Sequence, residues 1–258
     1  MRRLCTAWVI VLCSGMLGRA ELSSAERTDV MPLRGHVQSV HLYGLSNPRP
    51  VIVSSGDGGW IHLGPHVARL LAAHGYFVLG FDVRAYLTSF TSGTDTLRIG
   101  DEPADYRTLS EYASQHTRSK PILIGISEGA GLSVLAASDA ATQRSIGGVI
   151  GIGLPDRNEL GWRWKDSMIY LTHGVPNEPT FSAAALVGRV SPLPLALLQS
   201  THDDFVPLTD AQRMLGLGGQ PRRLWIVPAS DHRFSDNLSE FDQRLLEAVD
   251  WVTENEPR

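Results

Sequence analysis

Short β-branched segments alternate with longer amphipathic ones along almost the whole chain. Residues 50–54, 121–125 and 148–154 have the length and the continuous apolar character of buried parallel strands. Residues 61–74 and 238–252 instead place apolar side chains at helical spacing. Strands that alternate with helices are typical of a mainly parallel sheet with helices on both faces. The sequence therefore predicts a doubly wound α/β fold.

Other segments complete this predicted sheet. Strands are expected at residues 36–43, 76–81, 193–199 and 222–227, and helices at 103–116 and 128–137. With 258 residues, 43% of them hydrophobic, the chain is long enough to bury one substantial core, so a single domain over residues 21–258 is expected. The one long stretch without periodicity, residues 155–192, is predicted to be a short lid insertion or pocket wall.

One pentapeptide lies at a junction between a predicted strand and a predicted helix. Gly125-Ile126-Ser127-Glu128-Gly129 has the pattern G-x-S-x-G, with an apolar segment before it and a small-residue segment after it. This is the context of a nucleophile elbow, a sharp turn that lifts a serine hydroxyl clear of the sheet. The two glycines leave room for the neighbouring backbone. The motif predicts the α/β-hydrolase fold with Ser127 as the nucleophile.

A serine nucleophile needs a base, and the base needs an acid that orients it. In this fold the chain order is serine, acid, histidine, each after a later strand. The strand at 193–199 leads into Asp203 and Asp204, and the strand at 222–227 leads into Asp231 and His232. His232 is therefore the predicted base. Asp203, four residues before the proline of a Val-Pro pair, is favoured as the acid; Asp204 is the alternative, expected otherwise to cap or orient the next helix.

The predicted chemistry also requires backbone amides that bind the oxyanion. One is expected from Glu128, the residue after the nucleophile, and the other from Asp57 or Gly58 in the loop after the strand at 50–54. The glycines of this loop allow the backbone to bend close to the reacting carbonyl. A plain glycine turn before a helix is the alternative explanation.

Several aromatic residues are candidates for the wall of a substrate pocket. Trp60 follows the glycine loop, and Trp162 and Trp164 lie in the predicted lid with Tyr170 and Phe181 downstream. These rings would wall an acyl or head-group pocket, or they would pack the lid against the domain.

The N-terminus has the pattern of an export signal. Arg2 and Arg3 precede the apolar residues 4–17, and small residues follow at the positions that signal peptidase inspects. Residues 1–20 are therefore predicted to be a cleavable signal peptide, which makes the protein periplasmic or secreted. Both cysteines, Cys5 and Cys13, fall inside this segment, so no disulfide framework is expected in the mature chain.

Charge and composition narrow the classes of partner. The formal net charge of −4 gives no reason to expect nucleic acid, which selects basic faces. His62 and His66 have the i, i+4 spacing of a zinc pair but lack the H-E-x-x-H glutamate, so no metal is predicted and no cofactor is needed. The expected partner is a small-molecule or lipid ester. A lipid ester would bring the protein into transient contact with a membrane surface. The sequence sets no oligomeric state.

The motifs resemble the bacterial virulence-associated VirJ/AcvB family of exported proteins. The matching segments are Ser55-Gly56-Asp57-Gly58-Gly59-Trp60, the Ser127 elbow with Gly129-Ala130, and Asp231-His232-Arg233-Phe234-Ser235-Asp236. That family usually has a tyrosine before the nucleophile and an aspartate after the Gly-Ala pair, where this chain has Ile126 and Gly131. The acid segment 203–207 is more similar to general esterases and dienelactone-hydrolase-like enzymes. The resemblance implies a periplasmic location and hydrolysis of the aminoacyl ester on aminoacylated phosphatidylglycerol.

Three functions remain open at this stage. The first is an exported carboxylic-ester hydrolase that acts on a lipid, which would expose an apolar patch around Trp162 and Trp164. The second is a hydrolase of small esters, thioesters or lactones, which would bury those two rings. The third is a non-catalytic periplasmic binding or chaperone-like module on a hydrolase scaffold, because fold alone does not decide function.

Overall fold

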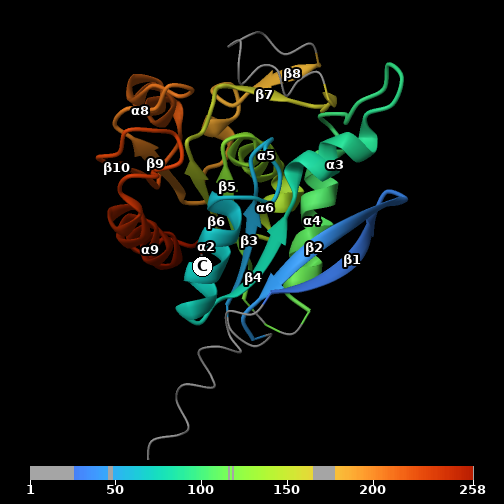
Figure 1. Cartoon of the computed structure of the whole chain (residues 1–258), viewed down its shortest axis with the longest axis horizontal. Coiled ribbons are helices and arrows are strands. Elements are labelled where there is room, and N and C mark those ends of the chain that lie inside the picture. The colour runs from blue at the N-terminus through green and yellow to red at the C-terminus, as the bar shows by residue number, and fades with distance from the viewer. Residues whose placement is uncertain (1–25, 46–48, 116, 118, 165–177, 258) are drawn as a thin grey trace, which may run out of the picture.

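The computed structural model describes residues 26–45, 49–115, 117, 119–164 and 178–257, and it is built around one large sheet (Figure 1). The strand order is β1-β2-β4-β3-β5-β6-β9-β10. β2 runs antiparallel to β1 and β4, and the strands from β4 to β10 are parallel. The predicted mainly parallel sheet is confirmed. The strands are β1 (Arg27–Leu33), β2 (His36–Tyr43), β3 (Pro50–Ser54), β4 (Phe77–Phe81), β5 (Ile122–Ile126), β6 (Gly148–Ile152), β9 (Leu195–Ser200) and β10 (Arg222–Val227).

Helices cover both faces of this sheet, as Figure 1 shows. They are α2 (Leu63–Ala73), α3 (Val83–Phe90), α4 (Glu102–Ala113), α5 (Glu128–Ala137), α6 (Ala140–Gln143), α8 (Leu208–Leu217) and α9 (Leu238–Glu254). A separate pair of short strands, β7 (Arg157–Glu159) and β8 (Thr180–Ser182), and the 3-10 helix η2 (Val187–Arg189) lie between β6 and β9. None of the helices within the described ranges is long and apolar enough to span a membrane.

The strand pattern divides the core into two layers. In β5, Ile122 and Ile124 face the layer covered by α2 and α9, whereas Leu123 faces the layer covered by α3, α4 and α5. All three side chains are fully buried. A strand that is buried on both faces must be apolar at every position, which explains the continuous hydrophobic segments in the sequence.

The register of the central strands aligns their carboxyl ends. Ser54 of β3 pairs with Gly125 of β5, Ile126 of β5 pairs with Ile152 of β6, and Ile152 pairs with Leu198 of β9. The loops that follow these strands therefore emerge along one edge of the sheet. Ligand sites of open α/β sheets form at this edge.

The structure adds elements that the sequence pattern did not predict. β1 begins shortly after the predicted signal peptide, in a segment rich in polar residues. It is an edge strand that buries only Met31 and Leu33, so its sequence shows little hydrophobic periodicity. α3 is rich in aromatic and β-branched residues, which disfavour helices, and is started by Asp82, whose carboxylate accepts the N–H of Ala85. The expectation that residues 155–192 are irregular is wrong where β7 pairs with β8. The predicted signal peptide lies outside the described residues.

One buried carboxyl group has no partner. Glu102, in the first turn of α4, has no exposed surface, and neither of its carboxyl oxygens has a hydrogen-bond partner. Burial raises its pKa well above the usual range, and the charges of Asp105 and Asp139 raise it further. A buried polar group without a partner opposes folding, and it opposes folding more once it is ionised.

We expect Glu102→Met to increase the free energy of unfolding by about 1–3 kcal/mol at neutral pH, because it removes this unpaired group. In the unfolded chain the Glu102 carboxyl ionises at its ordinary pKa of about 4.3. The folded pKa is raised, so the wild type loses stability as the pH rises above that value, and the gain from Glu102→Met should grow with it.

Denaturant unfolding at pH 5 and pH 8 measures this difference. Glu111→Met is the matched control, because Glu111 is an exposed glutamate on the same helix. A gain that is equal at both pH values, or equal in the control, would contradict the assignment of an unpaired buried carboxyl.

Candidate active site

The turn from β5 to α5 places Ser127 in a conformation that side-chain-bearing residues rarely adopt. Its φ is 51° and its ψ is −117°, and it immediately precedes the first residue of α5. Its N–H donates to the carbonyl of Ile152 on β6, at 2.8 Å, which fixes the turn to the neighbouring strand. Strain of this kind concentrates at functional sites and persists only where the surroundings enforce it.

The two glycines of the pentapeptide are required by close backbone packing. A Cβ atom on Gly125 would overlap the backbone of Gly129 and Ala130, and one on Gly129 would overlap the carbonyl oxygens of Ser54 and Ser55. α5 therefore begins in direct contact with the end of β3. This contact brings the loop after β3 beside the nucleophile.

Asp203 is held by four hydrogen bonds in the loop after β9. Its Oδ2 accepts from His232 Nδ1 at 2.6 Å and from Gln199 Nε2 at 2.9 Å, and its Oδ1 accepts the N–H groups of Phe205 and Val206. Burial acts to raise the pKa of Asp203, but these bonds and the charge of His232 hold it below the usual range. The carboxylate therefore stays ionised next to the imidazole at neutral pH.

His232 is packed against the glycine that follows β6. The imidazole lies so close to Gly153 that a Cβ atom there would be 2.6 Å from its Cε1. The Phe205 ring packs edge-on against the imidazole, with ring centroids 5.6 Å apart. Because Ser127 is bonded to Ile152, the residue before Gly153, the same strand end contacts the nucleophile and the predicted base. With Nδ1 bound to Asp203, Nε2 is the ring nitrogen left for proton transfer.

The other polar residues near the predicted triad have different partners. Of the two roles predicted for Asp204, capping is wrong, because α8 has no side-chain cap. Asp203 instead bonds the turn before this helix, and a role of Asp204 in orienting the helix stays a prediction. Asp231 accepts the N–H groups of Arg233 and Ser235 and so shapes the loop around His232. His202 Nδ1 lies 3.0 Å from Thr201 Oγ1. Of the candidate acids, the structure brings Asp203 to His232.

The loop after β3 passes close to Ser127. A Cβ atom on Gly56 would be 3.4 Å from the Cβ of Ser127, so the backbone of this loop lies against the nucleophile. Asp82 anchors the far end of the loop by accepting the N–H of Trp60. Asp57 and Gly58, the predicted oxyanion donors, lie between these two fixed points and are partly exposed.

Sequence reasoning placed Trp60 among the pocket residues, and the structure shows what its indole contacts. It fills the space above Gly80 and Gly64, where a Cβ atom would meet the ring, and it stacks on His41 with ring centroids 4.9 Å apart. Its Nε1 donates to Tyr43 Oη. These contacts hold the indole between α2 and the strands β2 and β4.

The two lid tryptophans differ in exposure. Trp164 is 81% exposed, whereas Trp162 is half-buried, with the Arg84 guanidinium 5.5 Å from its ring centroid. Phe181, on β8, is buried in the core. Tyr170 lies outside the described residues.

Carboxyl groups gather next to the nucleophile. Glu128, the first residue of α5, is buried, and its Oε1 accepts the N–H of Glu159 on β7 at 2.5 Å. Burial raises the pKa of Glu128 well above the usual range, and the charges of Asp57 and Glu159 raise it further. The raised pKa favours the neutral form of Glu128, while Asp57 and Glu159 bring negative charge to this part of the site.

A buried asparagine fills the space beside Gly131, the position at which the resembled family has an aspartate. Asn158, on β7, is fully buried, and a Cβ atom on Gly131 would overlap its amide. Asn158 Nδ2 donates to the carbonyl oxygens of Pro155 and Asp156. The absence of a side chain at position 131 thus makes room for a polar group from the lid segment.

Sequence reasoning missed Gln199, Gly153 and Phe205. Gln199 lies inside a buried apolar strand, where a polar residue is itself a signal, because a buried amide needs partners. Gly153 follows directly after β6 with a φ of 58°, a conformation that glycine tolerates best. Phe205 carries no signal that separates it from other exposed loop residues.

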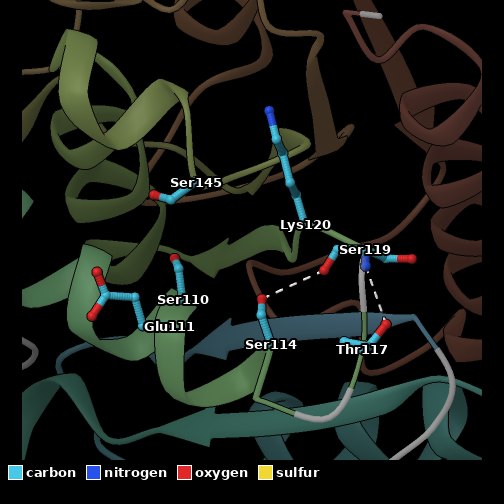
Figure 2. A pocket seen from close by; sticks show the side chains of 7 residues that line it. All are labelled: Ser110, Glu111, Ser114, Thr117, Ser119, Lys120 and Ser145. Atoms are coloured by element: carbon cyan, nitrogen blue, oxygen red, sulfur yellow. Dashed lines mark hydrogen bonds between the residues drawn. The ribbon is translucent and has the colours of Figure 1, made fainter.

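Two open pockets lie outside this arrangement. A cavity of about 210 Å³ is lined by Ser110, Ser114, Lys120 and neighbouring residues, at the amino end of β5 (Figure 2). Figure 2 shows Ser114 and Thr117 bonded to Ser119, with Lys120 extending away from them. Because the length of β5 separates this cavity from Ser127, it is not part of the site.

A second cavity lies between α2 and the loop after His232. Within the described ranges, no three His, Cys, Asp or Glu side chains are arranged to hold a metal ion.

Comparison with solved structures decides the fold. The "Alpha/beta hydrolase GrgF from Penicillium sp. sh18" aligns with a TM-score of 0.67 and 13% identity over 90% of this chain and 99% of its own. The Pyrococcus furiosus esterase Pf2001 aligns with a TM-score of 0.66 and 16% identity over 96% of this chain and 95% of its own. The chain is an α/β-hydrolase by fold. A "membrane phospholipase A, a novel bacterial virulence factor" also aligns, with a TM-score of 0.64 and 14% identity over 91% of this chain and 89% of its own.

Sequence comparison supports the resemblance that the motifs indicate. Residues 49–158 match the family described as "Bacterial virulence protein (VirJ)". The matched segment contains the glycine-tryptophan loop and the Ser127 elbow but ends before Asp203 and His232. A search of curated proteins finds no significant match. This α/β-hydrolase therefore resembles VirJ over less than half of its length.

The contacts of Asp203 predict how the two neighbouring aspartates differ. Asp203→Asn should slow the reaction of Ser127 with a fluorophosphonate by about 10⁴-fold, because the orienting charge next to His232 is lost. Asp204→Asn should change the rate less than twofold, since Asp204 forms no hydrogen bond with His232. The second-order labelling rate measures both variants. Equal losses, or a larger loss for Asp204→Asn, would contradict Asp203 as the orienting acid.

Proposed function

We propose that this α/β-hydrolase is a serine hydrolase that cleaves carboxylic esters. One observation carries the proposal: the strained Ser127 and the bonded pair Asp203–His232 converge on the end of β6. Nucleophile, acid and base in this chain order and at this sheet edge are the arrangement of the serine hydrolases of this fold. The esterases and the phospholipase among its structural relatives agree with this class of reaction.

The proposed reaction has two steps. Ser127 Oγ attacks the ester carbonyl carbon while His232 Nε2 takes the hydroxyl proton, and Asp203 stabilises the imidazolium that forms. The tetrahedral intermediate collapses, and the leaving alcohol receives the proton from His232. Water then attacks the acyl-enzyme with His232 as the base again, which releases the carboxylic acid and restores Ser127.

Backbone amides would stabilise the negative oxygen of each intermediate. The N–H of Glu128 at the start of α5 is one proposed donor, and the N–H of Asp57 or Gly58 is the other. The contact between Gly56 and Ser127 supports this assignment, because it brings the loop to the nucleophile. Loss of one such donor typically slows catalysis by roughly 10²-fold to 10³-fold.

The proposed substrate class is an aminoacyl ester on a lipid. The electronegative surroundings formed by Asp57 and Glu159 favour an acyl group with a protonated amine. The 81% exposure of Trp164 supports a lipid-facing surface, whereas the half-buried Trp162 adds little to it. The resemblance of the motifs to the VirJ/AcvB family implies the same class, and residues 49–158 match the VirJ family. With the N-terminal export pattern, these features favour action outside the cytoplasm.

We expect a fluorophosphonate probe to label the wild type and not Ser127→Ala, because only a serine activated by a neighbouring base reacts rapidly. Ester hydrolysis, followed with p-nitrophenyl acetate, should fall to the background of the buffer in the same variant. Ser239→Ala is the matched control, since Ser239 is an exposed serine on α9. Folded wild type that takes up neither this probe nor a smaller one would favour the non-catalytic binding module.

The electronegative surroundings predict a preference for a free amine. The wild type should hydrolyse alanine ethyl ester with a kcat/KM about 5- to 10-fold higher than N-acetylalanine ethyl ester, since one close charge pair contributes roughly 1 kcal/mol. Glu159→Gln should reduce this ratio towards one. Glu111→Gln, far from the site at the other end of β5, should leave the ratio unchanged. A ratio near one in the wild type would contradict an aminoacyl substrate and favour neutral esters.

A further inference from the structure

A basic pocket lies beside the proposed active site. It has a volume of about 330 Å³ and is formed by the first turns of α2 and the loop that follows His232. Its polar lining consists of His62, His66, Arg69, Arg233 and Ser235, and its apolar lining of Leu63 and Leu238. No aspartate or glutamate lines it. A half-open cavity with this lining complements an anion.

The two arginines have the freedom to bind a ligand. Across the part of the chain that the structure describes, neither Arg69 nor Arg233 forms an ion pair within 4 Å of a carboxylate. Both side chains are exposed. Glu26 interacts electrostatically with Arg69, but its carboxylate is paired with His41. Guanidinium groups bind phosphate oxygens through paired N–H donors, which makes arginine well suited to this type of ligand.

The acidic groups around the pocket have partners of their own. Asp242 lies 2.6 Å from His66 Nε2 and so orients this imidazole. Asp231 accepts the N–H groups of Arg233 and Ser235. Asp236 accepts the N–H of Ser230. These carboxylates shape the loop and one histidine, and the cationic groups of Arg69 and Arg233 remain available.

The pocket is connected to the proposed active site through the chain on both sides. Arg233 directly follows His232, and His62 lies three residues after Gly59 of the loop that approaches Ser127. Phe234 anchors the intervening turn by packing on Phe241, with ring centroids 4.7 Å apart. The pocket therefore adjoins the predicted base on one side and the loop that approaches Ser127 on the other.

We infer that this pocket binds a phosphate group and positions a phosphodiester-bearing substrate for attack by Ser127. The chemistry that it recognises is a phosphate monoester or diester with its oxygens between Arg69 and Arg233. The anion site stands on the pocket alone, whereas its use by the substrate rests on the proposed function.

Calorimetric titration tests the anion site without any reaction. Inorganic phosphate and glycerophosphoglycerol, a soluble phosphodiester, are titrated into the wild type and into Arg69→Gln/Arg233→Gln at constant ionic strength. We expect millimolar or tighter binding that weakens tenfold or more in the double variant. Arg144→Gln is the matched control and should bind like the wild type, because Arg144 is an exposed arginine at the C-terminal end of α6. Absence of binding to the wild type, or equal binding in the double variant, would overturn the anion site.

Kinetics then separate a substrate site from a site for free phosphate. The two substrates are alanyl esters of glycerol and of glycerophosphoglycerol, which differ in the phosphodiester. The preference of the wild type for the second, measured as a kcat/KM ratio, should fall tenfold or more in the double variant. Phosphate binding without such a preference would overturn the substrate role and leave a site for free phosphate.

Calorimetry and kinetics test the anion site and the serine hydrolase proposal separately. If the wild type hydrolyses neither ester, the serine hydrolase proposal fails, while the calorimetric result still decides the anion site. Thermal unfolding checks that the double variant is folded. The single variants Arg69→Gln and Arg233→Gln repeat the test if it is not, and each should lose part of the phosphate affinity.

Discussion

The strained turn at Ser127 is the constraint on which the rest of the site depends. A non-glycine residue at a φ of 51° costs roughly 1–3 kcal/mol, and the turn persists because its neighbours leave it no alternative. Gly125 and Gly129 allow the start of α5 to touch the end of β3, and the N–H of Ser127 is bonded to Ile152. The same contacts fix the position of the loop at residues 56–60 and of Gly153, against which His232 packs. The nucleophile, the base and the amide loop thus share one set of backbone contacts.

Its hydrogen bonds explain why Asp203, and not Asp204, is suited to orient His232. Three of the four hydrogen bonds to Asp203 come from β9 and the loop after it, and the fourth comes from His232. The bonds from His232, Val206 and Phe205 hold the pKa of this carboxyl low despite its burial. A carboxylate that remains ionised and immobile next to an imidazole is prepared to stabilise positive charge there. Asp204, one residue later, points its side chain towards solvent and has none of these bonds.

The charges around the proposed site lie on different elements. The negative charges come from Asp57 in the loop after β3 and from Glu159 on β7, next to the start of α5. Arg69 and Arg233 lie at α2 and at the loop before α9. A substrate with an amine on its acyl side and a phosphate on its alcohol side would match this separation. The exposed ring of Trp164 adds an apolar surface on the side of the lid.

Local patterns determined most of the fold and the identity of the candidate residues. Buried parallel strands must be apolar at every position, so β3, β5 and β6 were predictable to within about two residues, and the strand-to-helix context singled out Ser127. Edge strand β1 and helix α3 were not predictable, because their stability comes from pairing and capping and not from periodicity. Only the tertiary structure decided that Asp203 and not Asp204 faces His232, that Gln199 and Gly153 position this pair, and that Arg69 and Arg233 share one pocket. Such contacts join residues far apart in the chain, and they depend on strand register and helix packing, which no local pattern encodes.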